Sequence, residues 1–139
     1  MSKEIIEYNW EMFDKDIKTI HNYIKCLRTK ILAIVAIPRG GLVLGTKLSH
    51  LLNIPLFFSL NEVSKKYKQN EICIVDDISD TGETLKILGV DNYNVITLFM
   101  KPQTNFIPNF FCKLANNNSW IVFPWENEKT EKLKCKKDN

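Results

Sequence analysis

Two adjacent carboxylic acids close an apolar segment near the middle of the chain, and a loop rich in hydroxyl groups follows them. Asp76 and Asp77 can accept hydrogen bonds from a diol or hold a hard cation such as Mg²⁺. In the loop, Thr81 and Thr84 supply hydroxyl donors, and Gly82 lets the backbone approach an anion closely. A helix predicted to begin here would add unpaired N–H groups and a positive dipole end. Phosphate, diol and metal ligands together describe a site for a sugar phosphate.

The same segment has a simpler, purely structural interpretation. Ser79 or Asp80 would then be only a helix N-cap, and the two acids would merely end a strand. That interpretation accounts for one or two residues, but not for the whole string from Ile74 to Thr84. We therefore favour the sugar-phosphate site.

A second unusual loop, Pro38-Arg39-Gly40-Gly41, breaks the apolar run Ile31–Ile37. Arg39 can clamp phosphate oxygens with a bidentate fork, and Gly40 exposes its N–H to an anion. The alternative is a Pro-Gly turn that carries a solvated arginine. The presence of a partner loop after Asp77 favours a second phosphate contact.

Strands alternate with helices along the chain, which implies an α/β fold with a mostly parallel sheet flanked by helices. In such folds ligands bind beyond the carboxyl ends of the strands, so we expect the two loops to face one crevice. The polar segment Asn61–Asn70 is predicted to be a loop. The predicted helices are Trp10–Leu27, Leu42–Leu52 and Thr81–Leu88, and the predicted strands are Ile31–Ile37, Leu56–Leu60, Glu71–Asp77, Val95–Met100 and an edge strand Phe110–Leu114.

Size and composition fit one globular domain. The chain has 139 residues, of which 45% are hydrophobic, and this argues against wholesale disorder. No apolar run reaches the roughly 20 residues that a membrane-spanning helix needs, and the N-terminus lacks a signal-peptide pattern. The widely spaced cysteines favour free thiols in a reducing compartment. We therefore expect a cytoplasmic protein with no membrane partner.

The net charge of +3 lies in the last residues of the chain. From Lys129 onward five lysines outnumber Glu131 and Asp138, which leaves the preceding residues neutral in sum. The body is therefore not a polyanion-binding surface, and nucleic acid is not expected as a partner. We predict a single domain over residues 1–128 and a disordered basic tail over residues 129–139.

The segment from Ile74 to Thr84 resembles the signature with which type I phosphoribosyltransferases bind phosphoribosyl pyrophosphate (PRPP). Both have an apolar strand, two acids, two variable positions and then Asp-Thr-Gly-x-Thr. The resemblance implies that Asp76 and Asp77 hold the ribose hydroxyls and that Asp77 is the Mg²⁺ ligand. It also implies a 5′-phosphate site formed by Ser79, Asp80, Thr81, Gly82, Glu83 and Thr84.

The loop at residues 38–41 is similar to the Ser-Arg-Gly-Gly pyrophosphate loop of the bacterial xanthine-guanine phosphoribosyltransferases, with Pro38 in place of serine. This similarity implies that Arg39 and Gly40 bind pyrophosphate. The family tends to carry a non-proline cis peptide in this loop, so we expect one at Pro38–Arg39 or Arg39–Gly40.

Two later segments resemble the base site of the same enzymes. Lys101-Pro102 is similar to their Lys-Pro, and residues 120–126 are similar to their Trp-Ile-x-x-Pro-Trp-Asp. By that resemblance Trp120 stacks on a purine, the backbone of Ile121 contacts its edge, and Lys101 reaches a 6-oxo group. A lysine donor selects oxo over amino. Alternatively, Trp120 and Trp125 are aromatic residues of the core or of an interface.

The resemblance implies a type I phosphoribosyltransferase fold with a small C-terminal hood and a shortened flexible loop. It implies Mg²⁺-dependent transfer of the phosphoribosyl group from PRPP to xanthine, guanine or hypoxanthine, with release of pyrophosphate, in purine salvage. Asp80 would also contact the base and accept or share its N7 proton. The catalytic residues would be Asp80, Asp76, Asp77 and Arg39. Family members form dimers or tetramers, so we expect a homo-oligomer, with aromatic residues such as Phe106, Phe110 or Phe111 exposed at the interface.

Three departures from the family pattern keep other functions open. Glu83 puts negative charge in the phosphate loop, and Val122 replaces an acid. The family usually has a long mobile loop where this chain has only Asn61–Asn70, and which of Lys65, Lys66 or Lys68 would supply its basic residue stays open. The main alternative is therefore a non-catalytic regulator that binds PRPP or a nucleotide on the same fold. A third possibility is a pyrimidine or adenine as the base, although Lys101 argues against adenine.

Overall fold

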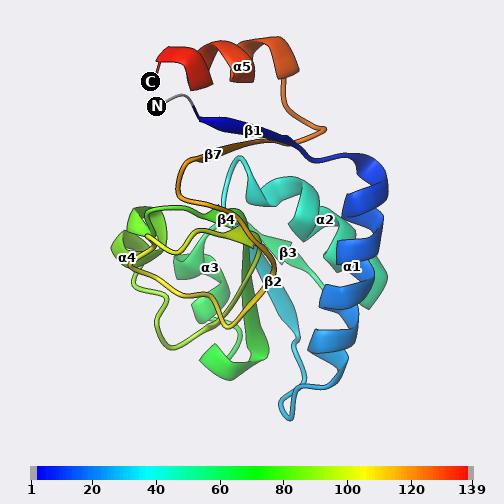
Figure 1. The fold of residues 1–139 in the computed structure, drawn as a ribbon. Coiled ribbons are helices and arrows are strands. Elements are labelled where there is room, and N and C mark those ends of the chain that lie inside the picture. Colours follow the sequence, from blue (N-terminus) through cyan, green and yellow to red (C-terminus); the bar gives the residue numbers. More distant parts are fainter. Residues whose placement is uncertain (1–2, 138–139) are drawn as a thin grey trace.

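The computed structural model describes residues 3–137, and a five-stranded sheet forms its centre (Figure 1). Every neighbouring pair of strands in this sheet is parallel, which confirms the predicted α/β class. In spatial order the strands are β3 (Leu56–Phe57), β2 (Ala33–Ala36), β4 (Ile72–Ser79), β5 (Asn94–Met100) and β6 (Phe110–Leu114). β6 lies at the edge of the sheet, as predicted.

Helices cover both faces of this sheet because alternate residues of its strands point to opposite sides. Ile34 and Ala36 of β2 lie in one apolar cluster with residues of α1 (Trp10–Lys25) and α2 (Gly41–Leu52). Ala33 and Val35 lie in a second cluster with residues of α3 (Leu60–Ser64) and α4 (Glu83–Leu88). The central strands β2, β4 and β5 are therefore mostly buried on both faces, whereas the edge strands β3 and β6 are partly exposed.

Local signals set the ends of the main helices. The side chain of Asn9 accepts a hydrogen bond from the backbone N–H of Met12 at 2.8 Å and caps the start of α1. α4 ends at Gly89, whose left-handed backbone (φ 66°) terminates the helix. None of the helices within residues 3–137 is long and apolar enough to cross a membrane.

A second, two-stranded sheet forms a hood above the central sheet (Figure 1). In it β1 (Glu4–Glu7) runs parallel to β7 (Ser119–Val122), and α5 (Glu128–Lys137) packs against β7. Sequence periodicity did not predict β1, because this short strand forms only through its pairing with a distant segment. The hood thus joins the two ends of the chain.

Helix α5 replaces the disordered tail that we predicted from residue 129. Cys135 and Glu131 are buried, and Lys132 forms an ion pair with Glu7 of β1 at 2.9 Å. The predicted boundary at residue 128 also falls at the start of this helix. Docking on the hood, rather than helix propensity, orders the segment; Asp138 and Asn139 lie outside the described residues.

The segment Asn61–Asn70 is not the loop that we predicted. α3 covers its first residues, and a 3-10 helix, η1 (Gln69–Glu71), precedes β4. Val63 is fully buried in the second cluster, which anchors this turn of helix. Strand β3 is correspondingly shorter than predicted, because the chain has already left the sheet at Phe58, which is 60% exposed.

Candidate active site

The loop at residues 38–41 lies directly against β4, the strand that leads into the second predicted loop. Pairing of β2 with β4 ends at Ala36 and Val75, so Asp76 and Asp77 extend beyond the neighbouring strand. The chain after β2 crosses in front of them. A Cβ atom on Gly40 would overlap the carboxylate of Asp77, and one on Gly41 would lie 2.5 Å from the carbonyl oxygen of Val75. Glycine at these two positions therefore permits the close approach.

The Arg39 loop has the backbone that the resemblance implied. The peptide bond between Pro38 and Arg39 is cis, one of the two positions expected. The Gly41 N–H donates to Ile37 O at 2.8 Å, which closes the turn. Arg39 is exposed, and its side chain and Gly40 line a cavity of about 520 Å³ together with Asp77.

Asp76, which is buried, and Asp77, which is half-buried, form an acid pair. Backbone N–H groups satisfy one oxygen of each carboxylate: Asp77 N donates to Asp76 Oδ1, and Ile78 N donates to Asp77 Oδ1, both at 2.8 Å. Burial, together with the neighbouring charge of Asp77, raises the pKa of Asp76 to about 9. Burial also raises the pKa of Asp77. A cation or a hydrogen-bond donor beside the pair would favour its ionised form.

The donor set around Asp77 fits Mg²⁺ that arrives with a phosphorylated ligand. Mg²⁺ usually takes one or two protein carboxylates and fills its remaining positions with phosphate oxygens and water. Among residues 3–137 no group of three or more acidic, histidine or cysteine side chains is arranged to hold a metal. Asp77, with Asp76 beside it, therefore supplies one or two carboxylates and leaves the other positions to the ligand.

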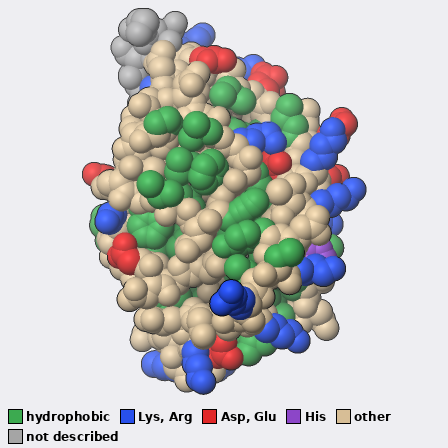
Figure 2. Space-filling model, turned by 60° about the horizontal axis from the view of Figure 1, so that its bottom comes forward, with side chains coloured by type: hydrophobic (Ala, Val, Ile, Leu, Met, Phe, Trp, Pro, Cys, Tyr) green, Lys and Arg blue, Asp and Glu red, His purple; other side chains and the backbone are tan. Residues whose placement is uncertain are grey.

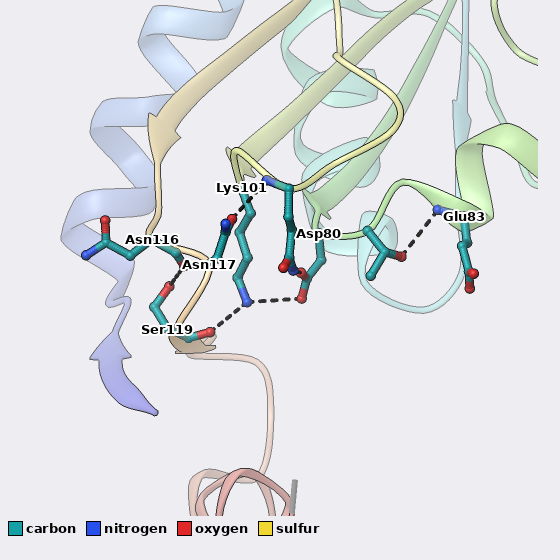
Figure 3. A network of polar contacts seen from close by, with 8 residues as sticks. Asp80, Glu83, Lys101, Asn116, Asn117 and Ser119 are labelled. Atoms are coloured by element: carbon teal, nitrogen blue, oxygen red, sulfur yellow. Dashed lines mark hydrogen bonds and ion pairs between the residues drawn. The ribbon is translucent and has the colours of Figure 1, made fainter. Parts of the chain in front are cut away.

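The loop after β4 surrounds a cavity of about 220 Å³ lined by residues 76–85. Gly82 adopts φ 83° at the start of α4, and a side chain there would overlap the backbone and side chains of residues 104–106. Thr81 and Thr84 are exposed at this cavity. Glu83 is also exposed, and in Figure 3 only its backbone N–H makes a contact, to Thr81 Oγ1 at 3.4 Å.

Ser79 differs from its predicted role as a phosphate ligand in one respect. Its side chain is buried, and its hydroxyl contacts Thr104 Oγ1 at 2.7 Å and donates to Phe106 O at 2.8 Å. The hydroxyl therefore braces the loop against residues 104–106, and the backbone is what Ser79 can offer to a ligand.

Asp80 and Lys101 form an ion pair at the other side of the loop (Figure 3). Lys101 Nζ lies 3.1 Å from Asp80 Oδ2 and donates to Ser119 O at 2.6 Å, and its side chain is only 4% exposed. Gln103 Nε2 donates to Asp80 Oδ1 at 2.5 Å. The structure thus brings Asp80 and Lys101 together, as the prediction of a shared base site requires. Sequence reasoning did not find Gln103, whose residue type alone gives no signal.

Strand β7 carries the two other predicted base-site residues. Asn118 O accepts a hydrogen bond from Glu4 N of β1 and Val122 O accepts one from Tyr8 N just after β1, whereas Ser119 O accepts one from Lys101. Because carbonyl directions alternate along a strand, the backbone of Ile121 faces the same way as Ser119 O, away from β1. The Ile121 side chain is buried in the core.

The two tryptophans of the hood segment have different surroundings. Trp120 is half-buried with Lys3 Nζ 4.8 Å from its ring centre, and its buried Nε1 has no acceptor within the described part of the chain. Trp125 stacks on Phe123 with ring centres 4.9 Å apart and 12° between the planes, inside a larger aromatic group. This arrangement supports a structural role for Trp125, which was one of the two predicted alternatives.

The cavity beside Arg39 also has a wall that sequence reasoning missed. Glu126 and two residues of α5, Glu131 and Lys134, face Arg39 and Asp77 across it. Burial, and then repulsion from Glu131 and Asp77, raises the pKa of Glu126. Glu126 follows Trp125 in a segment that resembles the family, so the sequence partly indicated this residue. It did not indicate the residues on α5, because this helix was not predicted. By contrast, Lys65, Lys66 and Lys68 do not line either of these two cavities.

An acid pair, a glycine turn and a helix start at the ends of parallel strands are typical of α/β proteins that bind phosphorylated ligands. More specifically, residues 6–128 match the model of the phosphoribosyl transferase domain, and the chain belongs to this family. The xanthine-guanine phosphoribosyltransferase of Nitratidesulfovibrio vulgaris strain Hildenborough is 23% identical over 143 residues, which cover 91% of this chain and 87% of that protein. The enzyme of the same name from Desulfotalea psychrophila is 26% identical over 136 residues, which cover 86% and 77%.

Solved structures show the same fold. A purine phosphoribosyltransferase from Pyrococcus horikoshii has a TM-score of 0.72 and 28% identity, covering 88% of this chain and 94% of that one. The xanthine-guanine-hypoxanthine phosphoribosyltransferase of Helicobacter pylori has a TM-score of 0.75 and 22% identity, covering 95% and 98%. A hypothetical protein from Neisseria gonorrhoeae with bound ppGpp has a TM-score of 0.74 and 19% identity, covering 100% and 99%.

Proposed function

We propose that this protein is a purine phosphoribosyltransferase that transfers the 5-phosphoribosyl group of PRPP to a 6-oxopurine in the presence of Mg²⁺. The observation that carries the proposal is the contact between Gly40 and Asp77, which joins an arginine-bearing loop to the acid pair. The relatives named above support the class of reaction, although their low identity leaves the preferred base among xanthine, guanine and hypoxanthine open.

PRPP would span the two cavities around the end of β4. The 5′-phosphate would lie in the cavity of residues 76–85, against the backbone N–H groups of residues 80–84 and the hydroxyls of Thr81 and Thr84. The ribose hydroxyls would meet Asp76 and Asp77. The pyrophosphate would lie beside Arg39 and Gly40 in the larger cavity.

The base would lie between Asp80, Lys101 and the hood strand. Lys101 Nζ has three N–H donors and uses two of them on Asp80 and Ser119, so one is left for a 6-oxo group. The outward backbone of Ile121 would bond the base edge, and Trp120 would stack on its face. This arrangement favours an oxo group over the amino group of adenine.

The reaction is displacement of pyrophosphate at ribose C1 by a purine nitrogen, through a transition state with positive charge on the ribose. Arg39 would neutralise the departing pyrophosphate, and Mg²⁺, when bound, would add positive charge there. Asp76 and Asp77 would fix the ribose, so that C1 faces the base. Asp80 would accept or share the N7 proton, a contribution of typically 10²–10⁴-fold for such groups.

The test is a transfer assay with radiolabelled guanine, xanthine, hypoxanthine and adenine, each with PRPP and Mg²⁺. We expect nucleoside 5′-monophosphate from at least one 6-oxopurine and much less from adenine. Transfer to adenine alone would refute the assignment of Lys101. Omission of Mg²⁺ is expected to abolish transfer.

The second candidate function is a non-catalytic regulator that binds PRPP or a nucleotide. The short segment 60–71, whose lysines lie away from both cavities, favours it because a lid normally excludes water from the reacting cation. The Neisseria protein with ppGpp bound is an example of the fold holding a nucleotide. Tight, Mg²⁺-dependent PRPP binding in calorimetry without transfer to any base would identify a regulator.

We further propose a cytoplasmic homo-oligomer, a dimer or tetramer. Hydrophobic side chains emerge in several groups on the face shown in Figure 2. The predicted interface residues need correction, because Phe106 is buried and Phe110 and Phe111 are partly covered. Ile87 and Ile107, which are 85% and 72% exposed, are better candidates. If Ile87 lies in the interface, the Ile87→Asp variant should dissociate into monomers, and sedimentation of the variant measures this.

A further inference from the structure

Gln103 occupies a position beside the proposed base site that no known role explains. Its side chain is exposed, yet its amide donates to Asp80 Oδ1 at 2.5 Å. Lys101 Nζ lies 3.1 Å from the other oxygen, Oδ2. Both oxygens of the half-exposed Asp80 carboxylate are therefore held, and each keeps a lone pair for a further donor.

The local sequence places Gln103 where it can reach Asp80. Thr104 N donates to Lys101 O at 3.1 Å, which closes a turn with Pro102 at its second position. Proline is favoured there because its ring presets φ. The turn brings the side chains of residues 101 and 103 to the same carboxylate from two sides.

The backbone of Gln103 is anchored as well. Its N–H donates to Asn117 Oδ1 at 2.9 Å, in the Asn116–Asn118 turn that leads into β7 (Figure 3). Asn105 N donates to Thr81 O at 2.8 Å from the other end of the same segment. Residues 101–105 thus connect the loop after β4 to the strand that carries Trp120.

We propose that Gln103 is a positioning residue for Asp80. The side-chain amide of Gln103 holds the Asp80 carboxylate toward the N7 edge of the bound purine. The proposal rests on the proposed function. Without the amide, the half-exposed carboxylate keeps only its contact with Lys101 and can turn toward solvent. Gln103 itself lines neither of the two PRPP cavities, so we expect its main effect on the step that involves the base.

The test compares Gln103→Leu, which removes the donor, with Gln103→Glu, which keeps the shape but sets a second carboxylate against Asp80. Hydrogen bonds to charged groups of this kind predict a roughly tenfold fall in kcat with guanine for Gln103→Leu, and a larger fall for Gln103→Glu. KM for PRPP is expected to stay within about twofold of the wild-type value, because the PRPP contacts are untouched. Gln69→Leu, an exposed glutamine of η1, is the matched control and should be unchanged.

A double-mutant cycle separates positioning from a general structural role. In an Asp80→Asn background, Gln103→Leu should have no further effect on kcat, because it acts through Asp80. Full activity of Gln103→Leu, an equal loss of PRPP affinity, or a loss that persists in the Asp80→Asn background would overturn the proposal. A rise in kcat/KM would also overturn it and indicate that the amide obstructs the base.

Calorimetry with guanosine 5′-monophosphate keeps the inference distinct from the proposed function. If the wild type binds this nucleotide but transfers nothing, the proposed enzyme activity fails. In that case the affinity for guanosine 5′-monophosphate is measured across the same double-mutant cycle. Gln103→Leu should weaken binding only when Asp80 is present. If the wild type binds neither the nucleotide nor PRPP, both proposals fall.

Discussion

Gly40 lies against the carboxylate of Asp77 so closely that a methyl group on residue 40 would overlap all three of its atoms. This contact joins the loop after β2 to the end of β4. The two segments therefore meet at one end of the sheet, where we propose that PRPP binds. The contact also makes residue 40 sensitive to the smallest substitution.

Gly40→Ala is expected to lower kcat/KM for PRPP by about 100-fold, because displacement of a binding group by about 1 Å has effects of this size. Steady-state kinetics with varied PRPP measures it. Gly89→Ala is the control: Gly89 has φ 66° and open space around it, so alanine there would cost about 1 kcal/mol of stability without touching the site. Equal kinetic losses in the two variants would show that Gly40→Ala acts through stability alone.

Asp76→Asn is expected to stabilise the free protein in alkaline solution. Burial raises the pKa of Asp76 to about 9, so the folded state binds a proton that the unfolded state releases above about pH 4. Stability from this group is thus complete below about pH 4 and is lost progressively as the pH rises from about 4 to about 9. The gain from asparagine should be near zero at pH 4 and should reach roughly 5–7 kcal/mol at pH 9, since a difference of one in pKa is worth about 1.4 kcal/mol.

Thermal or urea unfolding at several pH values measures this difference. Asp14→Asn, at an exposed acid of α1, is the control and should show no such trend. A gain for Asp76→Asn that did not change with pH, or a loss at pH 9, would contradict the assignment. Transfer activity of Asp76→Asn should nevertheless fall, because the ribose loses a carboxylate partner.

Lys101→Met is expected to reduce discrimination between oxo and amino bases. The substitution removes a buried ammonium from Asp80 and Ser119, and kcat/KM for guanine should fall about 10- to 100-fold while the low activity with adenine stays unchanged. Lys86→Met, at an exposed lysine of α4, serves as the control. A parallel fall with both bases would mean that Lys101 only supports the loop.

Trp120→Leu and Trp125→Leu should separate binding from packing. Loss of a stacked base partner costs about 1–3 kcal/mol, so Trp120→Leu should raise KM for the purine about tenfold or more. Trp125→Leu opens the aromatic group around Phe123 and should lower the melting temperature while changing KM little. If instead Trp120→Leu lowered the melting temperature and Trp125→Leu raised KM for the purine, Trp125 would be the stacking residue and Trp120 the structural one.

The parallel sheet could be predicted from the sequence because its buried strands are continuous apolar runs and its helices are amphipathic. Residues 76–84 stood out in the sequence because residue types suited to an anion, a diol and a cation follow one another there. The cis peptide at Pro38–Arg39 came from the family resemblance and is present in the structure. Local segments were therefore predictable in their backbone, whereas the ligand roles of their residues stay predictions.

Features that depend on distant pairing were missed. β1 exists because Glu4–Glu7 finds β7, more than a hundred residues away in the chain, and α5 is ordered by docking on the hood. The short helix α3 depends on the burial of Val63. Likewise, the contact of Gln103 with Asp80 requires the turn at Pro102 and the anchor at Asn117. None of these partners is visible in a local pattern.

The most direct test is the formation of guanosine 5′-monophosphate from guanine, PRPP and Mg²⁺ by the purified wild-type protein, with pyrophosphate quantified in the same reaction. Our account predicts nucleotide and pyrophosphate in equal amounts, and a fall in rate of about 10²–10⁴-fold in Asp80→Asn with PRPP binding retained. Binding of PRPP by the wild type without any nucleotide formed from guanine, xanthine or hypoxanthine would contradict it.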